Sequence, residues 1–201
     1  MNSFSNYIGV LTDTANKIDI KALEACVDIM IDAYKKGGTI YIFGNGGSGA
    51  TASHVSGDFI KGVSLGLSRK FKVVFLNDNV SAMLAISNDL SYDDIFVEQL
   101  RGRLNNEDVV IGISGSGNSI NVVKALEYSI EQKVKTVAFC GYKGGKIKDM
   151  ADSVVHIPVM DMEITEDLHL VAFHAIKQEI IIRLAGNMKV SMGEQYDKRI
   201  K

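Results

Sequence analysis

Short runs of apolar residues alternate along the chain with longer stretches in which apolar residues recur at helical spacing. The short runs are apolar at successive positions, which is typical of strands buried on both faces of a parallel sheet. The five runs are TIYIF (39–43), KVVFL (72–76), VVIGIS (109–114), TVAFC (136–140) and SVVHIP (153–158). The pattern predicts one α/β domain over residues 1–201, a three-layer sandwich with a five-stranded parallel sheet and helices on both faces.

The stretches between the runs predict the helices. Extra helices precede the first strand in a segment over residues 1–37, one at 4–16 and a longer one that begins at Asp19 and ends at Gly37. The helices expected after the first strand are 48–62, 80–87, 93–104, 118–132 and 163–185. A polar tail over residues 187–201 is expected to be mobile.

Charge and composition exclude several classes of partner. The formal net charge is −2, so no broad basic field is available to attract nucleic acid. No apolar run approaches the roughly 20 residues that span a bilayer, and the first residues lack the pattern of a secretory leader. Cys26 and Cys140 lie in apolar surroundings, as buried thiols do. We therefore expect a cytoplasmic protein with no nucleic acid partner and no membrane association.

Two segments share one layout of apolar strand, Gly/Ser/Asn loop and helix: IYIFGNGGSGATASHV (40–55) and VVIGISGSGNSINVV (109–123). A helix N-terminus binds anions through its free N–H groups, and glycine lets the backbone approach the ligand closely. Neither loop has the Gly-Lys-Ser/Thr of a nucleotide-binding P-loop or the spacing of a dinucleotide fold. The loops predict a site for the phosphate of a small molecule, although loops of this kind also occur as simple tight turns.

The residues of these loops resemble the SIS (sugar isomerase) family. The resemblance rests on FGNGGS (43–48) with His54 and Asp58 after it, and on ISGSGNS (113–119). The chain is most similar to the phosphoheptose isomerases, which interconvert sedoheptulose 7-phosphate and a heptose 7-phosphate. The resemblance covers about residues 5–185 and includes the matching patterns N-D (88–89), D-D-I-F (93–96), G-G-K (144–146) and E-D-L-H-x-x-x-x-H (166–174). It implies an isomerase that acts through an enediol, and a homo-oligomer, expected to be a tetramer.

Two pairs of residues are candidate metal ligands. His54 and Asp58 are four residues apart and share one helix face, and Glu166 and His174 lie two turns apart on the last helix, about 80° apart around it. Two imidazoles and two carboxylates suit zinc or a similar divalent ion. The resemblance maps a metal site onto these four positions, and we expect one zinc ion there. The family has Glu where this chain has Asp58 and Gln where it has Glu166.

The resemblance also assigns roles in catalysis and binding. Asp58 is the expected base and His174 its proton-transfer partner, while the metal polarises the substrate carbonyl. At Gly115 the family carries a hydroxyl-bearing residue instead. The residues expected to bind the substrate are Asn45, Gly46, Gly47, Ser48, Asn88, Asp89, Ser114, Gly115, Ser116, Ser119 and Glu166.

Structural roles are open for each of these groups. His54 could be a buried histidine, Asp58 could pair with Lys61, and Glu166 could be an acid favoured by a helix N-terminus. His169, three residues after Glu166, could replace or support a metal ligand.

Other functions are open for the whole chain. SIS domains also serve as regulators that sense a phosphosugar or as adaptors for another protein. Such a domain needs the two loops but not the acid and histidine residues. An isomerase for a different phosphosugar is a third reading.

Overall fold

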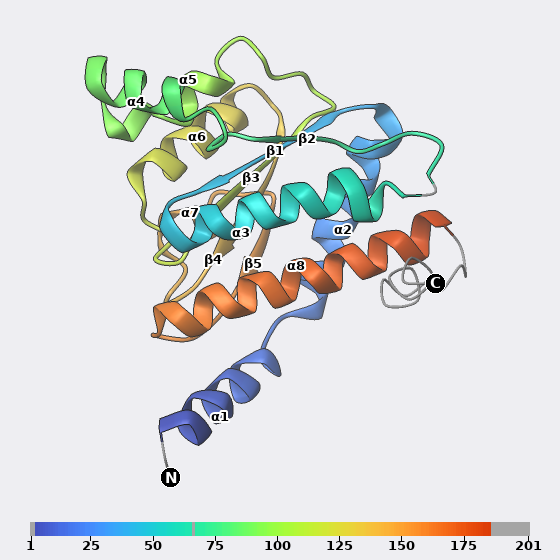
Figure 1. Ribbon diagram of the computed structural model, residues 1–201, viewed down its shortest axis with the longest axis vertical. Coiled ribbons are helices and arrows are strands. Elements are labelled where there is room, and N and C mark those ends of the chain that lie inside the picture. Colours follow the sequence, from blue (N-terminus) through green and yellow to red (C-terminus); the bar gives the residue numbers. More distant parts are fainter. Residues whose placement is uncertain (1–2, 66, 186–201) are drawn as a thin grey trace, which may run out of the picture.

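A computed structural model describes residues 3–65 and 67–185, so the tail predicted over 187–201 lies outside the described residues. In this part of the chain, strands and helices alternate after two initial helices. Figure 1 shows the layered arrangement, with the sheet between helices and both described ends at the periphery.

The sheet has five parallel strands in the order β2-β1-β3-β4-β5, which confirms the fold class predicted from the apolar runs. The strands are β1 (Thr39–Gly44), β2 (Lys72–Phe75), β3 (Val109–Ser114), β4 (Lys135–Cys140) and β5 (Ser153–His156). Strand β1 is central to the topology because it pairs with β2 on one side and with β3 on the other.

Helices cover both faces of the sheet. One face is covered by α2 (Ile20–Lys36), α3 (Gly46–Gly57) with its π-helical extension η1 (Asp58–Val63), and α8 (Met162–Ala185). The other is covered by η2 (Tyr92–Asp94), α5 (Val97–Leu100), α6 (Ile120–Glu131) and α7 (Gly145–Lys148), with α4 (Val80–Asp89) packed beside η2. Helices α3 and α8 run side by side on their face, as Figure 1 shows.

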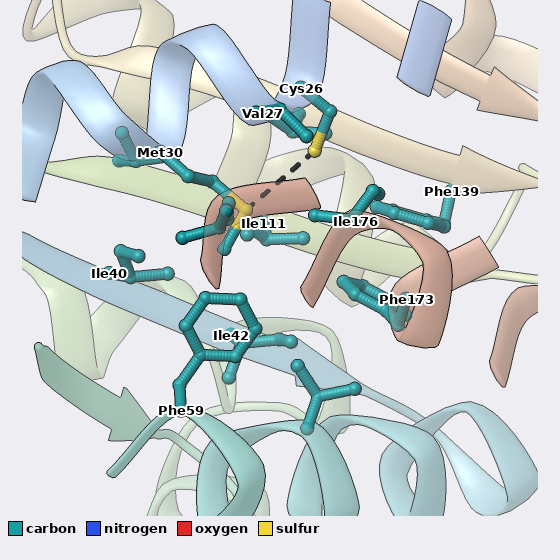
Figure 2. Packing of buried hydrophobic residues seen from close by; sticks show 14 of the residues in the cluster. Cys26, Val27, Met30, Ile40, Ile42, Phe59, Ile111, Phe139, Phe173 and Ile176 are labelled. Atoms are coloured by element: carbon teal, nitrogen blue, oxygen red, sulfur yellow. Dashed lines mark hydrogen bonds between the residues drawn. The ribbon is translucent and has the colours of Figure 1, made fainter. Parts of the chain in front are cut away.

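The core on the α2, α3 and α8 face explains why the strands are apolar at successive positions. Ile42 of β1 and Ile111 of β3 point to this face, where they pack among Met30, Phe59 and Phe173 (Figure 2). Consecutive side chains of a strand point to opposite faces, so each strand needs apolar residues at both odd and even positions. Each fully buried large side chain contributes about 1.5–3 kcal/mol to stability.

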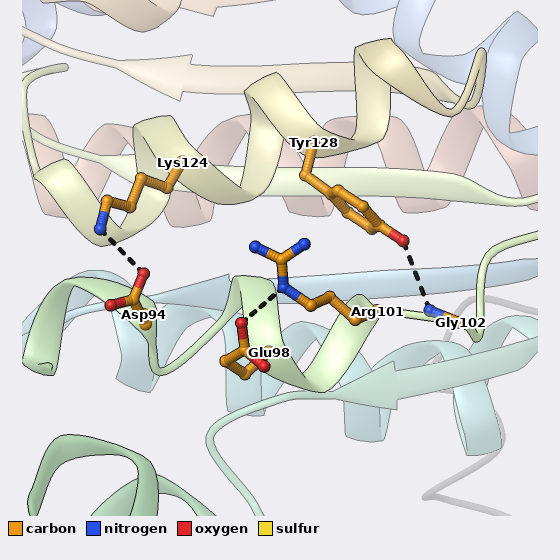
Figure 3. Close-up of polar contacts among 6 residues, drawn as sticks. All are labelled: Asp94, Glu98, Arg101, Gly102, Lys124 and Tyr128. Atoms are coloured by element: carbon orange, nitrogen blue, oxygen red, sulfur yellow. Dashed lines mark hydrogen bonds and ion pairs between the residues drawn. The ribbon is translucent and has the colours of Figure 1, made fainter. Parts of the chain in front are cut away.

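The second core receives the alternate side chains. Phe43 of β1 packs on Phe96 with ring centroids 4.7 Å apart. Polar contacts then fix η2 and α5 to α6: Lys124 pairs with Asp94 at 2.8 Å, and Arg101 lies over the ring of Tyr128 (Figure 3).

The segment predicted as one helix over 93–104 is divided, and this prediction was wrong. The 3₁₀ turn η2 and the short helix α5 replace it, and α5 ends because Arg101 takes non-helical backbone angles before Gly102, whose φ is +68°. The boundary expected at Asn88 and Asp89 also differs, since both residues belong to the last turn of α4.

Helix α1 (Ser3–Ala15) packs on the start of α8 and not on the sheet. Its Tyr7 donates a hydrogen bond of 2.7 Å to Asp167, and its Leu11 packs against the cluster of Ile157, Ile164 and Leu168. No helix in the described part of the chain is both long and apolar enough to cross a membrane.

His169 makes stability depend on pH. Its ring is fully buried in α8, with its edge toward Phe139. Burial lowers the pKa of His169 from 6.5 to about 4, because the protonated ring loses its solvation there. Between these pH values the unfolded chain binds a proton that the folded chain does not, so stability falls as the pH falls through this window.

Replacing this imidazole by an apolar side chain should flatten that dependence. In His169→Leu, the loss of unfolding free energy between pH 7 and pH 5 should be smaller by about 2 kcal/mol than in the parent protein. Urea denaturation at the two pH values measures it, with His156→Gln, which removes a partly exposed imidazole, as the control. An equal loss in His169→Leu and the parent protein would contradict the expectation.

Candidate functional site

The two Gly/Ser loops lie next to each other at one edge of the sheet. They follow β1 and β3, which are neighbours, and Gly44 is in register with Ile113. From β1 the chain crosses to β2 on one side, and the later strands lie on the other. The carboxyl ends of strands at such a reversal of strand order are the usual ligand site of open α/β sheets.

Close backbone packing holds the first loop against the second. A Cβ atom at Gly44 would lie 2.8 Å from the carbonyl oxygen of Ile113, so only glycine permits this approach. After the loop, Ser48 is buried in the first turn of α3, and Gly46 is exposed at the helix start.

The second loop is organised by its own serines. The hydroxyl of Ser114 donates to the Oγ of Ser119 at 3.0 Å, and the Oγ of Ser116 accepts from the N–H of Asn118 at 3.2 Å. Gly117 has a φ of +69°, and a side chain there would overlap the carbonyl of Gly144. Ser114, Ser116 and Ser119, which the sequence predicted as phosphate ligands, thus cluster at the start of α6.

Both loops end in helices whose first turns lack a side-chain cap. Asn45 before α3 and Ser119 before α6 accept no hydrogen bond from the first helical turn, whereas Asp19 caps α2 and Asn79 caps α4. The first N–H groups of a helix have no partner within the helix, so an uncapped first turn can bind an anion. The short helices α5 and α7 also lack such a cap, so what marks the two loops is that their uncapped helix starts lie side by side at neighbouring strands.

Two residues that sequence reasoning missed join the loops. The side-chain amides of Asn45 and Asn121 exchange hydrogen bonds of 2.9 and 3.0 Å, and the hydroxyl of Tyr92 donates to Asn45 at 3.0 Å. A polar Asn121 at a buried position in the first turn of α6 was the signal available in the sequence. Tyr92 carried no such signal, because it lies in the short segment between the helices expected over 80–87 and 93–104.

A third loop supports the second. The N–H of Gly141 donates to the carbonyl of Gly115 at 2.8 Å, and the N–H of Lys146 donates to the side chain of Asn118 at 3.1 Å. Gly115 is buried, and a side chain at this position would overlap the sulfur of Met162 in α8. The hydroxyl-bearing side chain that the family carries there would therefore meet Met162 in this chain.

Three of the four predicted metal ligands come together between α3 and α8. The Nε2 atoms of His54 and His174 are 3.1 Å apart, and they lie 3.5 and 3.6 Å from Oδ2 of Asp58. The side chains are 51%, 43% and 20% exposed for His54, His174 and Asp58, so the group is open to solvent on one side. His54 is therefore not the buried histidine that one alternative proposed.

The spacing of these three atoms fits a zinc ion. Ligand atoms of a tetrahedral zinc with bonds of about 2.0–2.1 Å lie about 3.3 Å from one another. The three observed separations, 3.1, 3.5 and 3.6 Å, are close to this value. Two imidazoles with a carboxylate are also ligands that zinc accepts. Asp58 thus reaches the group although its side chain is one methylene shorter than the Glu of the family.

Asp58 also has a cationic partner. The Nζ of Lys177, in α8, lies 2.7 Å from the same Oδ2 atom that faces the imidazoles. The sequence suggested Lys61 as a partner on the same helix and did not predict this contact from the last helix.

Glu166 is not part of the three-residue group. Its carboxylate lies over Gly47, so closely that a Cβ there would overlap it. The prediction took the two residues to face one cleft although they are two turns apart, but their eight-residue spacing separates them by about 12 Å along α8, too far for one three-residue group. The site thus has an acid at the first loop and a separate three-residue group farther along α3.

The local environment shifts the pKa of two of these groups. Burial, together with the neighbouring carboxylates of Glu163 and Asp167, raises the pKa of Glu166. Burial lowers the pKa of His174, and Asp58 opposes this effect while His54 and Lys177 add to it. The neutral ring of His174 is the form that binds a metal or accepts a proton.

Other candidates lie farther from the group. Asn88 and Asp89 are exposed at the end of α4, where the amide of Asn88 donates to Asp89 at 2.7 Å. His169 is enclosed in the core against Phe139 and is not among the three gathered residues, so the expectation that it replaces or supports a ligand was wrong.

Comparison with known proteins agrees with the fold and the loops. Residues 3–141 match the SIS domain. The chain is 38% identical over 175 residues to the probable phosphoheptose isomerase of Thermoplasma volcanium, covering 86% of this chain and 87% of that protein. It is 37% identical over 155 residues to the phosphoheptose isomerase of Citrifermentans bemidjiense, covering 77% and 80%.

A solved structure agrees as well. The phosphoheptose isomerase of Neisseria gonorrhoeae superposes with a TM-score of 0.80 at 30% sequence identity, over 88% of this chain and 94% of that one. The chain therefore belongs to the SIS domain family, as the two Gly/Ser loops predicted.

Proposed function

We propose that this chain is a phosphosugar aldose–ketose isomerase that interconverts sedoheptulose 7-phosphate and a heptose 7-phosphate through an enediol. The observation that carries the proposal is the convergence of His54, Asp58 and His174 between two helices that start at or pack on the Gly/Ser loops. The relatives from Thermoplasma volcanium and Citrifermentans bemidjiense, named as a probable phosphoheptose isomerase and a phosphoheptose isomerase, support a phosphoheptose substrate. A regulator or adaptor, the alternative, has no need for this group.

The proposed binding mode places the phosphate end of the substrate at the two Gly/Ser loops and its carbonyl end farther along α3. The phosphate binds at residues 114–119, above the uncapped start of α6. His54 lies seven residues beyond Gly47, about 10 Å along α3. A long substrate with its phosphate at one end and its carbonyl at the other suits this separation, and Glu166 and Asn45 lie where they can bind hydroxyl groups between the ends.

Proton transfer is assigned to Asp58 and His174. Isomerisation removes a proton from the carbon on one side of the reaction and returns it to its neighbour. Oδ2 of Asp58 is engaged with Lys177 and the imidazoles, so its other oxygen, Oδ1, is the proposed base. The neutral ring of His174 is the proposed carrier of the proton that moves between the two oxygens. Zinc bound by His54, Asp58 and His174 would supply polarisation of the carbonyl.

We propose that the protein is a homo-oligomer, with a tetramer as the expected state and active sites at subunit contacts. The exposed apolar side chains Phe4 and Ile8 form one stripe on α1, 80% and 59% exposed. Val171, 49% exposed, lies one turn from the half-exposed His174. A second copy would cover these residues and shield the site from water.

The cytoplasm is the proposed location. Cys26 and Cys140 are buried free thiols, as expected in a reducing compartment, and charged sugar phosphates are substrates of that compartment.

Removing the ring of His174 should affect both the metal and the reaction. In His174→Ala, turnover of sedoheptulose 7-phosphate should fall by at least about 10²-fold, because the variant loses a metal ligand and the proton carrier. Zinc per chain, measured by atomic emission after dialysis, should also fall. His156→Ala is the matched control and should retain both, since that ring contacts the carbonyl of Tyr142 and lies apart from the site. Full zinc content in His174→Ala would overturn the metal assignment.

Removing single hydroxyls from the second loop should weaken phosphosugar binding. Ser116→Ala and Ser119→Ala should each cost roughly 1.5–3 kcal/mol, the value of a hydrogen bond to a charged group. Isothermal titration calorimetry with sedoheptulose 7-phosphate measures the affinity, and Ser68→Ala, at an exposed position beside Arg69, is the control. Unchanged affinity in both loop variants would place the phosphate elsewhere.

Disrupting the apolar stripe of α1 should dissociate the oligomer. Light scattering at micromolar concentration should give four times the mass of the chain for the parent protein and a smaller mass for Phe4→Glu/Ile8→Glu. Charged residues at these positions could not be buried between copies without a large desolvation cost. A monomer in the parent protein would contradict the proposal.

A further inference from the structure

Lys177 interrupts the apolar stripe by which α8 packs. Its neighbours in the stripe, Phe173, Ile176 and Ile180, are fully buried, and Lys177 itself is only 9% exposed. Lysine is almost never buried to this extent unless its charge is paired. The pair here is with Asp58, at 2.7 Å, so the burial of Lys177 is tied to the three-residue group.

The contact engages the atom on which a metal would depend. Oδ2 of Asp58 is the oxygen that faces Nε2 of His54 and of His174, and the same oxygen forms the ion pair with Lys177. A divalent ion among the three ligand atoms would therefore share its only carboxylate oxygen with an ammonium group. The ammonium group would also lie close to the positive charge of the ion, and like charges at this short distance repel.

The charges of the group are balanced before any ion binds. Asp58 contributes one negative charge and Lys177 one positive charge, while a divalent ion would add two further positive charges. Glu166, the other acid predicted as a ligand, lies over Gly47 and does not join the group. The group offers an ion a single carboxylate, and Lys177 already offsets its charge, so Lys177 opposes occupancy.

We propose that Lys177 is a built-in counter-ion of Asp58 that competes with the divalent metal and sets the metal affinity of the His54, Asp58 and His174 group. This inference rests on the proposed metal centre and describes how occupancy of that centre is limited. Competition from Lys177 makes the metal exchangeable. The metal binds only when its concentration is high enough to displace the ammonium group from Asp58. The chain then remains folded without metal, because Lys177 neutralises the buried carboxylate.

Zinc titration of the full-length protein tests the proposal. Protein dialysed against a chelator is titrated with zinc chloride by calorimetry, as the parent protein, Lys177→Met, Lys177→Arg, Lys124→Met and His174→Ala. Methionine keeps the length and apolar stem of Lys177 without its charge. Lys124→Met removes the lysine of another Lys–Asp pair, 2.8 Å from Asp94 on the opposite face (Figure 3), and is the matched control.

Zinc affinity should rise on the order of tenfold or more in Lys177→Met, and stay near the parent value in Lys177→Arg and Lys124→Met. Zinc should also raise the melting temperature of Lys177→Met more than that of the parent protein, since a tighter ligand stabilises more. Lys177→Gln, which is also uncharged, carries the same expectation if Lys177→Met does not fold.

The outcomes separate this inference from the proposed metal centre. Unchanged affinity in Lys177→Met would overturn the competition, and weaker affinity would assign Lys177 the opposite role of positioning Asp58 for the metal. If His174→Ala binds zinc as the parent protein does, the metal centre itself fails. Loss of zinc binding in His174→Ala with no gain in Lys177→Met would leave the centre intact and remove only the inference about Lys177.

Discussion

The burial of the apolar stripe of α8 is the interaction on which the rest of the site depends. Phe173, Ile176 and Ile180 of this stripe join the core that the sheet shares with α2 and α3, and this packing sets the axial position of α8 along α3. Polar residues between the buried ones then contact α3 at defined positions along its axis. Glu166 lies at Gly47, and His174 lies at His54. Because helices pack in a small set of registers, a shift of α8 by one turn would move His174 about 5 Å, away from His54 and Asp58.

The sheet positions the two Gly/Ser loops by a separate constraint. Parallel strands have their carboxyl ends at one edge, and the pairing of β1 with β3 makes their loops neighbours. The asparagine pair Asn45–Asn121 then joins the loops directly, so Asn45 serves the connection and does not cap α3. The helices that follow the two loops start without side-chain caps, as the short helices α5 and α7 also do, while α2 and α4 carry caps. Helices α3 and α6 therefore lack the stabilisation of a side-chain cap, about 1 kcal/mol for each helix. A bound anion can supply the missing hydrogen bonds instead.

The electrostatics of the three-residue group depend on one carboxylate. Asp58 lies within hydrogen-bonding or ion-pairing distance of His54, His174 and Lys177, and its negative charge partly offsets the effect of burial on the pKa of His174. The π-helical turn begins at Asp58, and such turns occur often at functional sites. The shorter acid still reaches both imidazoles, so the departure from the family at this position preserves the contact while Lys177 adds a charge that the sequence pattern did not indicate.

The sequence by itself determined the parallel sheet, most of its helices and the two Gly/Ser loops, because continuous apolar runs and Gly/Ser loops are local patterns with a direct physical meaning. It also identified His54, Asp58 and His174, through helical spacing and resemblance to the SIS family. Tertiary packing decided what local patterns do not contain: the division of residues 92–100 into two short turns, the links of Asn121 and Tyr92 to Asn45, the separation of Glu166 from the group and the pairing of Lys177 with Asp58. Rotation around a helix can be read from spacing, but which residues of two distant helices meet depends on their relative axial position, and only the burial of the whole core sets that position.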